Sequence, residues 1–139
     1  MMITTKGRYA LQVMAELGGY GADELVPLKE IAEKQGTSLK YLESIMATLS
    51  KGKLVESASG KGGGYKLTRK PEEYTIGEIL RLTEGNLSPV SCQAMDGKKC
   101  DHSNQCITLP FWQGLSDVIN DYLDSHTLKE LVHNNEEVK

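Results

Sequence analysis

Apolar residues recur every three or four positions in the first part of the chain, and this period predicts helices rather than strands. The first helix is expected to begin at Thr5 and to end at the glycine pair Gly18-Gly19. A short second helix is expected over Leu28–Gln35, and Gly36 can adopt the left-handed conformation that ends it. The inward positions of the first helix are Tyr9, Ala10, Val13, Met14 and Leu17.

A third helix is expected directly after this turn, from Leu39 to about Gly52, with Thr37 and Ser38 as N-terminal caps. Its inward stripe is expected to contain Leu39, Leu42, Ile45, Met46 and Leu49. Its outward face is expected to carry Lys40, Tyr41, Glu43, Ser44, Ala47 and Lys51. Two short helices joined by a tight turn are typical of a helix-turn-helix whose second helix enters the DNA major groove, although helical hairpins that bind nothing share the pattern.

Two strand-like runs between Leu54 and Leu67 flank the glycine-rich stretch Gly60–Gly64 and predict a β-hairpin wing. Glycines let a backbone approach a sugar-phosphate chain closely, and positive charge is supplied by Lys61, Lys66, Arg69 and Lys70. A flexible hairpin with solubilising lysines is the simpler alternative. A nucleotide phosphate loop is less favoured, because no Gly-Lys-Ser or Gly-Lys-Thr follows and no βαβ pattern surrounds the glycines.

The rest of the chain alternates between segments with a helical period of apolar residues and a segment without one. Thr75 and Glu78 form a capping-box pattern that opens a short helix ending near Gly85, and a second such pattern begins at Thr127. The predicted fold class is mainly α with a small β wing: a winged helix-turn-helix domain extended by a long C-terminal dimerisation helix. The expected parts are the DNA-binding domain at 1–85, a cysteine loop at 86–106, the dimerisation helix and a short C-terminal helix at 107–133, and a tail at 134–139.

The long helix is expected to begin around Pro110 and to carry an apolar stripe. The stripe consists of Phe111, Trp112, Leu115, Val118, Ile119, Tyr122 and Leu123. It could pack on its own winged domain, but a two-helix dimer seam is favoured because a loop separates the helix from that domain. A homodimer would place two recognition helices roughly 34 Å apart and would need a near-palindromic operator.

The chain has 139 residues and a net charge of −3, which conceals an asymmetry. Residues 1–70 carry eleven basic and seven acidic residues, a net charge of +4, whereas residues 71–139 carry five and twelve, a net charge of −7. A basic front half suits double-stranded DNA as a partner, although a chance imbalance of solvated faces would look the same. No apolar run is long enough for a membrane span or a signal peptide, so we expect a cytoplasmic protein without a membrane partner. No His, Ser and carboxylate constellation indicates an enzyme.

Three cysteines, Cys92, Cys100 and Cys106, lie in the expected loop. Three thiols on one loop favour zinc or an iron-sulfur cluster, because soft sulfur ligands suit both centres. Short zinc motifs usually pair cysteines about two to four residues apart, so the wider spacing here favours a cluster. Three unligated thiols are the alternative, and a fourth ligand has to come from another residue.

Four segments carry a family resemblance: Thr4-Thr5-Lys6-Gly7-Arg8-Tyr9-Ala10, Ser38-Leu39-Lys40-Tyr41-Leu42-Glu43, Gly60-Lys61-Gly62-Gly63-Gly64-Tyr65, and the cysteine loop followed by Phe111-Trp112. With them the chain resembles the IscR/NsrR family of dimeric winged-helix regulators, in the Rrf-two superfamily, over nearly its whole length. Glu43 is similar to the branch that controls iron-sulfur biogenesis rather than to the cysteine-free branch that controls cysteine metabolism.

The resemblance implies a dimeric transcription factor that binds DNA and holds an iron-sulfur cluster. DNA contacts are expected from Ser38, Lys40, Tyr41, Glu43 and Lys61, and cluster ligation from Cys92, Cys100 and Cys106. A 2Fe-2S cluster is the first expectation and a 4Fe-4S cluster the alternative. Cluster supply or redox state would then control DNA binding, with iron-sulfur biogenesis genes as targets. A nitric-oxide-responsive or thiol- or zinc-responsive repressor of the same fold is the alternative function.

Two positions depart from the family pattern. Regulators of the IscR type place a histidine three residues after the last cysteine, where this chain has Leu109, and their first cysteine gap is shorter. Members that sense nitric oxide draw an aspartate from the first helix, where this chain has Arg8. The fourth ligand therefore stays open among His102, Glu43, Asp96 and Asp101, with His102 ranked slightly first because imidazole suits iron.

Overall fold

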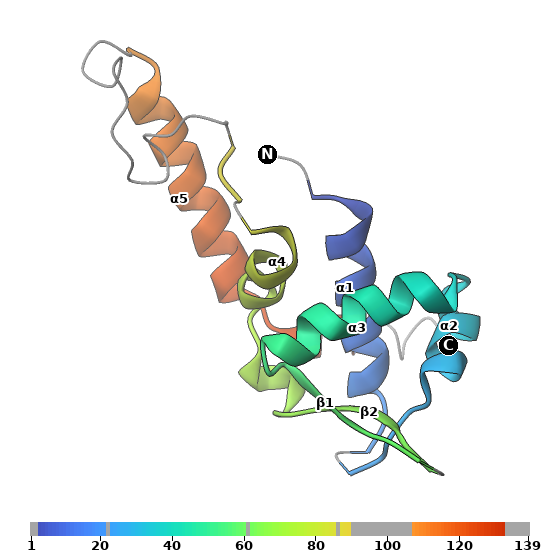
Figure 1. The fold of residues 1–139 in the computed structure, drawn as a ribbon. Helices are drawn as coiled ribbons and strands as arrows, with labels where there is room; N and C mark the ends of the chain where they lie inside the picture. Colours follow the sequence, from blue (N-terminus) through green and yellow to red (C-terminus); the bar gives the residue numbers. More distant parts are fainter. Residues whose placement is uncertain (1–2, 22, 61, 86, 90–106, 133–139) are drawn as a thin grey trace.

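The computed structural model describes residues 3–21, 23–60, 62–85, 87–89 and 107–132. In chain order the elements are α1 (Thr5–Gly18), α2 (Leu28–Gln35), α3 (Leu39–Lys51), β1 (Val55–Ala58), β2 (Gly64–Leu67), the 3-10 turn η1 (Pro71–Glu73), α4 (Ile76–Glu84) and α5 (Leu109–Ser125). A last helical turn spans 128–132. This mainly helical order with a small two-stranded sheet confirms the predicted fold class (Figure 1).

The helix-turn-helix forms where its sequence signals lie. Gly36 ends α2 with a φ of 63°, a left-handed conformation that favours glycine. The hydroxyl of Ser38 accepts a hydrogen bond from the backbone N–H of Tyr41 at 3.1 Å and so caps α3. The tight turn between α2 and α3 therefore follows from local chemistry.

The core lies around α1, which packs on α4, α2, α3 and β2. The side chains of the three helices that face α1 are fully buried at Ile31, Leu42, Ile45, Met46, Leu49 and Ile79. One predicted core position is wrong, because Leu39 is 45% exposed. Leu39 is the first residue of α3, and the stripe that packs inward starts one turn later, at Leu42.

The capping box predicted at Thr75 forms only in part. The hydroxyl of Thr75 accepts a hydrogen bond from the backbone N–H of Glu78 at 3.0 Å, as the pattern predicts. The carboxylate of Glu78 instead binds the guanidinium of Arg69 at 2.7 and 3.0 Å. The first turn of α4 is therefore joined to the chain that leaves the wing.

The wing is a short antiparallel hairpin in which Val55 lies opposite Leu67 and Ala58 opposite Gly64. Val26 and Tyr65 exchange two backbone hydrogen bonds of 2.9 Å, so the segment before α2 adds one further rung beside β2. The wing is thus attached by its backbone to the helix-turn-helix that it flanks.

Helix α5 extends away from the winged domain, as Figure 1 shows. Its C-terminal end is attached to α4, because Arg81 binds Asp124 and Asn120 through its two terminal nitrogens. Within the described ranges, no helix is both long and apolar enough to cross a membrane.

Candidate nucleic-acid interface

The exposed face of α3 carries several residues predicted to contact DNA. The side chains of Lys40 and Glu43 are exposed, and neither side chain forms a hydrogen bond or ion pair with another described residue. Ser38 is exposed, but its oxygen already accepts the capping bond from the Tyr41 N–H. Tyr41 is half-buried, and its ring meets that of Tyr9 edge-on at a centroid distance of 5.9 Å. With the exposed Lys51 at the end of the helix, the face therefore offers two cations and one carboxylate that can reach DNA without breaking a contact.

A groove of about 490 Å³ separates α3 from the wing. Glu43 lines it from α3, Leu28 from α2 and Tyr65 from β2. Glu43 is the only carboxylate among the described residues that line it. A carboxylate accepts a hydrogen bond from the amino group of cytosine and repels phosphate, so at this place it favours entry of a base edge over entry of a backbone.

Two of the basic residues predicted to give the wing its charge are paired within the protein. Lys66 lies opposite Glu56 in the hairpin, with its ammonium 3.6 Å from the carboxylate, and 3.9 Å from Asp23. Arg69 turns toward Glu78 of α4, whose hydrogen bonds raise the pKa of Arg69 above its usual range. The charge that this wing offers to DNA is therefore smaller than the sequence indicates, and the predicted contact Lys61 lies outside the described residues.

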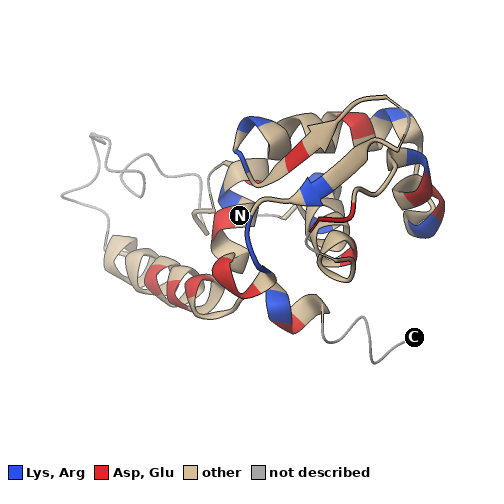
Figure 2. Cartoon of the chain, turned by 90° about the horizontal axis from the view of Figure 1, so that it is seen from below, with Lys and Arg blue, Asp and Glu red and all other residues tan. Residues whose placement is uncertain are grey.

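Acidic residues gather on α5. The helix contains Asp117, Asp121 and Asp124 and no Lys or Arg, whereas the basic residues of the described chain lie mainly on the winged domain (Figure 2). In the described part of the winged domain basic and acidic residues are equal in number, eleven of each, so the asymmetry in space comes from the acidic α5. The field of α5 repels DNA, and attraction to the winged domain depends on where its basic side chains lie.

The other face of α5 is apolar and exposed. Phe111, Val118 and Tyr122 are 67%, 66% and 64% exposed, and Leu115 lies between them at 37%. These residues are spaced four, three and four apart, so they share one side of the helix. A contiguous apolar face of this kind is typical of a surface that another element or molecule covers.

All the candidate cluster ligands except Glu43 lie in the part of the chain that is not described. These residues are Cys92, Cys100, Cys106, Asp96, Asp101 and His102. Among the residues that are described, no three His, Cys, Asp or Glu side chains are grouped to hold a metal ion. The structure does describe how the chain enters this segment, at the end of α4.

Glu84, the last residue of α4, binds the start of α1. Its Oε1 accepts hydrogen bonds from the backbone N–H of Gly7 at 2.8 Å and from the N–H and hydroxyl of Thr4 at 3.2 and 2.6 Å. A carboxylate at the N-terminus of a helix also interacts favourably with the helix dipole. The point where the chain leaves α4 toward the cysteines is thereby fixed to α1.

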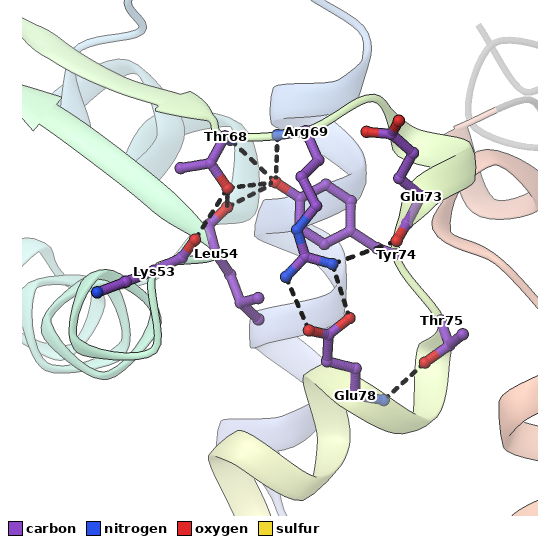
Figure 3. Close-up of polar contacts among 8 residues, drawn as sticks. All are labelled: Lys53, Leu54, Thr68, Arg69, Glu73, Tyr74, Thr75 and Glu78. Atoms are coloured by element: carbon purple, nitrogen blue, oxygen red, sulfur yellow. Dashed lines mark hydrogen bonds and ion pairs between the residues drawn. The ribbon is translucent and has the colours of Figure 1, made fainter.

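Sequence reasoning missed the fully buried Tyr74, whose hydroxyl is polar. It precedes the N-cap Thr75, and Ile79 follows in the fourth helical position, so the three form a hydrophobic-staple pattern that indicates burial. The pattern says nothing about the hydroxyl. In the structure that hydroxyl joins both ends of the wing (Figure 3).

Comparison with known proteins gives concordant matches. The Rrf2 family model, described as an iron-dependent transcriptional regulator, matches residues 3–134. The HTH-type transcriptional regulator IscR of Pectobacterium carotovorum is 39% identical over 136 residues, which are 98% of this chain and 82% of that relative. IscR of Aliivibrio salmonicida is 38% identical over 136 residues, with 98% and 80% covered.

Two solved structures extend the similarity to the fold. T. potens IscR superimposes with a TM-score of 0.78 at 36% identity, over 100% of this chain and 91% of that one. CymR, the global cysteine regulator of B. subtilis, superimposes with a TM-score of 0.80 at 34% identity, over 96% and 98%. Both likenesses include the winged domain and α5.

Proposed function

The chain belongs to the Rrf2 family of transcriptional regulators, which are DNA-binding proteins and not enzymes. We propose that this member is a homodimeric sensor whose three cysteines hold an iron-sulfur cluster. The observation that carries the proposal is the placement of the three-cysteine segment. It joins α4, which belongs to the winged domain, to α5, which carries the exposed apolar face. A change at the cysteines therefore acts on the connection between DNA reader and dimer helix.

DNA reading is assigned to α3 and the wing. Lys40 and Ser38 supply donors for base edges and phosphates, and Tyr41 contributes the edge of its half-buried ring. Glu43 selects for cytosine at one position, because its carboxylate accepts from the cytosine amino group. Lys61 at the wing tip contacts phosphate.

Dimerisation is assigned to the apolar face of α5. A second copy covers Phe111, Leu115, Val118 and Tyr122 best, because the same stripe on both chains is complementary to itself around a twofold axis. The operator is then a near-palindrome with half-sites roughly 34 Å apart. We place the protein in the cytoplasm, where its DNA target lies.

The donor set suits an iron-sulfur cluster. Cys92, Cys100 and Cys106 supply three soft thiolates, and a 2Fe-2S cluster is preferred over a 4Fe-4S cluster as the group they hold. When bound, the cluster supplies a reversible redox or occupancy signal. The chain's own residues can pass a change in the cysteine segment to the helices around it. Glu84 attaches the end of α4, just before this segment, to α1, and Arg81 attaches the C-terminal end of α5 to α4.

His102 remains our first choice for the fourth ligand. Glu43 lines the groove between α3 and the wing, where it faces the DNA side of the molecule, so ligation by it would remove a base contact. Single replacements His102→Ala, Glu43→Ala, Asp96→Ala and Asp101→Ala separate the candidates through the optical spectrum of the cluster and operator affinity. We expect His102→Ala to change the spectrum and Glu43→Ala to change only operator preference; the reverse pattern makes Glu43 the ligand.

Anaerobic purification tests the proposed cofactor. The protein is expected to be coloured and to contain iron and sulfide, and Cys92→Ala, Cys100→Ala and Cys106→Ala are each expected to bleach it. Expression with iron available that yields stoichiometric zinc and no iron contradicts the proposal. Regulated targets are expected to include iron-sulfur biogenesis genes, as the sequence resemblance implies.

The similarity to CymR supports a second candidate function, a thiol- or zinc-responsive repressor of the same fold. A nitric-oxide-responsive repressor of this fold is a further alternative. Zinc or metal-free thiols in the purified protein would favour the thiol or zinc response. Loss of operator binding on treatment of the iron-loaded protein with nitric oxide, without an effect of iron supply, would favour the nitric-oxide response.

A further inference from the structure

Both ends of the wing are held by one fully buried side chain, Tyr74 (Figure 3). Its hydroxyl donates to the backbone carbonyl of Leu54, just before β1, at 2.7 Å. It accepts from the backbone N–H groups of Thr68 and Arg69, just after β2, at 2.9 and 3.0 Å. A phenol has one proton and two acceptor positions, so these three bonds match its capacity, and its oxygen also lies 3.1 Å from the hydroxyl oxygen of Thr68.

The ring of Tyr74 is fixed to α4 by Arg69. The guanidinium carbon of Arg69 lies 4.6 Å from the ring centroid, within the range of a cation–π interaction. Its two terminal nitrogens bind the carboxylate of Glu78 in the first turn of α4, and one of them also donates to the carbonyl of Glu73 at 3.2 Å. The hydroxyl of Tyr74 therefore has a fixed position relative to α4.

The backbone of the same residue binds the chain that leaves α5. The carbonyl of Tyr74 accepts from the N–H of Leu128 at 3.0 Å, and the N–H of Ile76 donates to the carbonyl of His126 at 3.0 Å. Thr75 and Thr127 pair as an antiparallel bridge between these bonds. Since α5 ends at Ser125, the attachment begins directly after its last residue.

We propose that Tyr74 is the positioning residue through which the orientation of α5 sets the orientation of the wing on DNA. The inference rests on the proposed function, because it requires a wing that binds DNA. A rotation of α5 displaces residues 126–128, and their backbone bonds move Tyr74. The hydroxyl of Tyr74 then moves both ends of the wing together, because it binds Leu54 on one side and Thr68 and Arg69 on the other. Coupling between two sites is reciprocal, so DNA on the wing must also alter α5.

Trp112 provides a native reporter for that reciprocal effect. It is the only tryptophan of the chain and lies near the start of α5, roughly 20 Å along the helix from Ser125 at 1.5 Å per residue. An operator is first selected from random duplexes and labelled with a fluorophore. Binding of the full chain is then measured by the fluorescence anisotropy of this labelled operator. The emission of Trp112 is recorded separately at saturating operator, so that a loss of affinity cannot be mistaken for a loss of coupling.

Tyr74→Phe is the test variant, because it keeps the ring and removes only the hydroxyl. Tyr20→Phe is the matched control, since its hydroxyl is also hydrogen-bonded, to Glu30 at 3.0 Å, but not to the wing. We expect operator to change the Trp112 emission of the wild type and of Tyr20→Phe, and we expect Tyr74→Phe to lose at least half of the change at saturation. If Tyr74→Phe does not fold, Glu78→Gln, which weakens the Arg69 pair at a partly exposed position, is expected to lose part of the change.

A full Trp112 response in Tyr74→Phe overturns the proposal, and so does a wild type that binds operator without any response. A general loss of stability does not produce the expected result, because it changes the folded fraction and not the emission of the saturated complex. If the wild-type protein does not raise the anisotropy of any selected duplex, it does not bind DNA. That result contradicts the proposed function, on which the coupling between α5 and the wing depends.

Discussion

Arg81 of α4 and Asp124 of α5 form a two-point ion pair, with nitrogen–oxygen distances of 2.7 and 3.1 Å. The hydrogen bonds from Arg81 lower the pKa of Asp124 from its ordinary value of 3.8. Together with the Arg81–Asn120 hydrogen bond and the backbone bonds after Ser125, this pair holds α5 to the winged domain. Its contribution to stability therefore reports on the attachment of α5.

The stabilisation by this pair is expected to depend on pH. A carboxyl whose pKa is lowered by folding stabilises the fold above its unfolded pKa, and the stabilisation is lost as pH falls through the folded pKa. Since both side chains are more than a third exposed, Asp124→Asn is expected to cost only about 0.5 kcal/mol at pH 7 and less below pH 3.8. Urea unfolding at pH 7 and pH 3 measures this difference, with Asp117→Asn as the control. An equal cost at both pH values would contradict the assignment.

Gly7 is expected to be intolerant of a side chain, because a Cβ there would lie 2.4 Å from Oε1 of Glu84. Gly7→Ala must displace the flexible end of the Glu84 side chain, and the loss of its hydrogen bonds to the start of α1 is expected to cost about 1 kcal/mol in the free energy of unfolding. Gly21→Ala is the control, since its nearest contacts lie at 3.9 Å and it is exposed. Equal stabilities of the two variants in urea unfolding would show that the Glu84 carboxylate does not stabilise the N-terminus of α1.

A charge on the apolar face of α5 is expected to separate the dimer. Val118 is 66% exposed within one chain, so Val118→Asp leaves the fold of the chain intact and places a charge in the proposed seam. Analytical ultracentrifugation is expected to give a dimer for the wild type and a monomer for Val118→Asp, with unchanged helix content by circular dichroism. The exposed Asp121→Asn serves as the control and is expected to remain dimeric. A dimeric Val118→Asp protein would place the interface elsewhere.

The helix order follows from local signals, and the sequence therefore predicts it well. Gly36 and Ser38 act on their own backbone or on residues three positions away, so their roles need no knowledge of the fold. The exposure of Leu39 depends on how α3 crosses α1, and a helical period alone cannot show where the buried stripe starts. The first turn of a helix is where such a pattern is least informative.

The polar contacts at the wing depend on the fold, and the sequence does not predict them. Tyr74 meets Leu54 across 20 residues of chain, and Arg69 pairs with Glu78 only because the chain turns back at η1. From the sequence alone, Arg69 belongs to the positive charge that faces DNA. In the structure Arg69 pairs with Glu78 and lies over the ring of Tyr74, which binds both the wing and the residues that follow α5.

The wing is expected to contribute to the salt dependence of operator binding. The logarithm of the affinity falls with the logarithm of salt concentration by about 0.9 per phosphate contact, so Lys61→Ala is expected to reduce the slope by about one. Lys129→Ala, an exposed change outside the winged domain, is expected to leave the slope unchanged. If removal of both Lys61 and Lys66 also leaves it unchanged, the wing makes no phosphate contact.

The central claim is that the state of the three-cysteine segment controls what the winged domain binds, and operator affinity with and without the cluster tests it most directly. Selection from random duplexes is carried out with the anaerobic, cluster-loaded dimer and with the Cys92→Ala dimer, and each operator is then titrated with both proteins. We expect different preferred operators, or affinities for one operator that differ by about tenfold, which corresponds to a coupling free energy of about 1.4 kcal/mol. Identical operators bound with equal affinity by both dimers would contradict it.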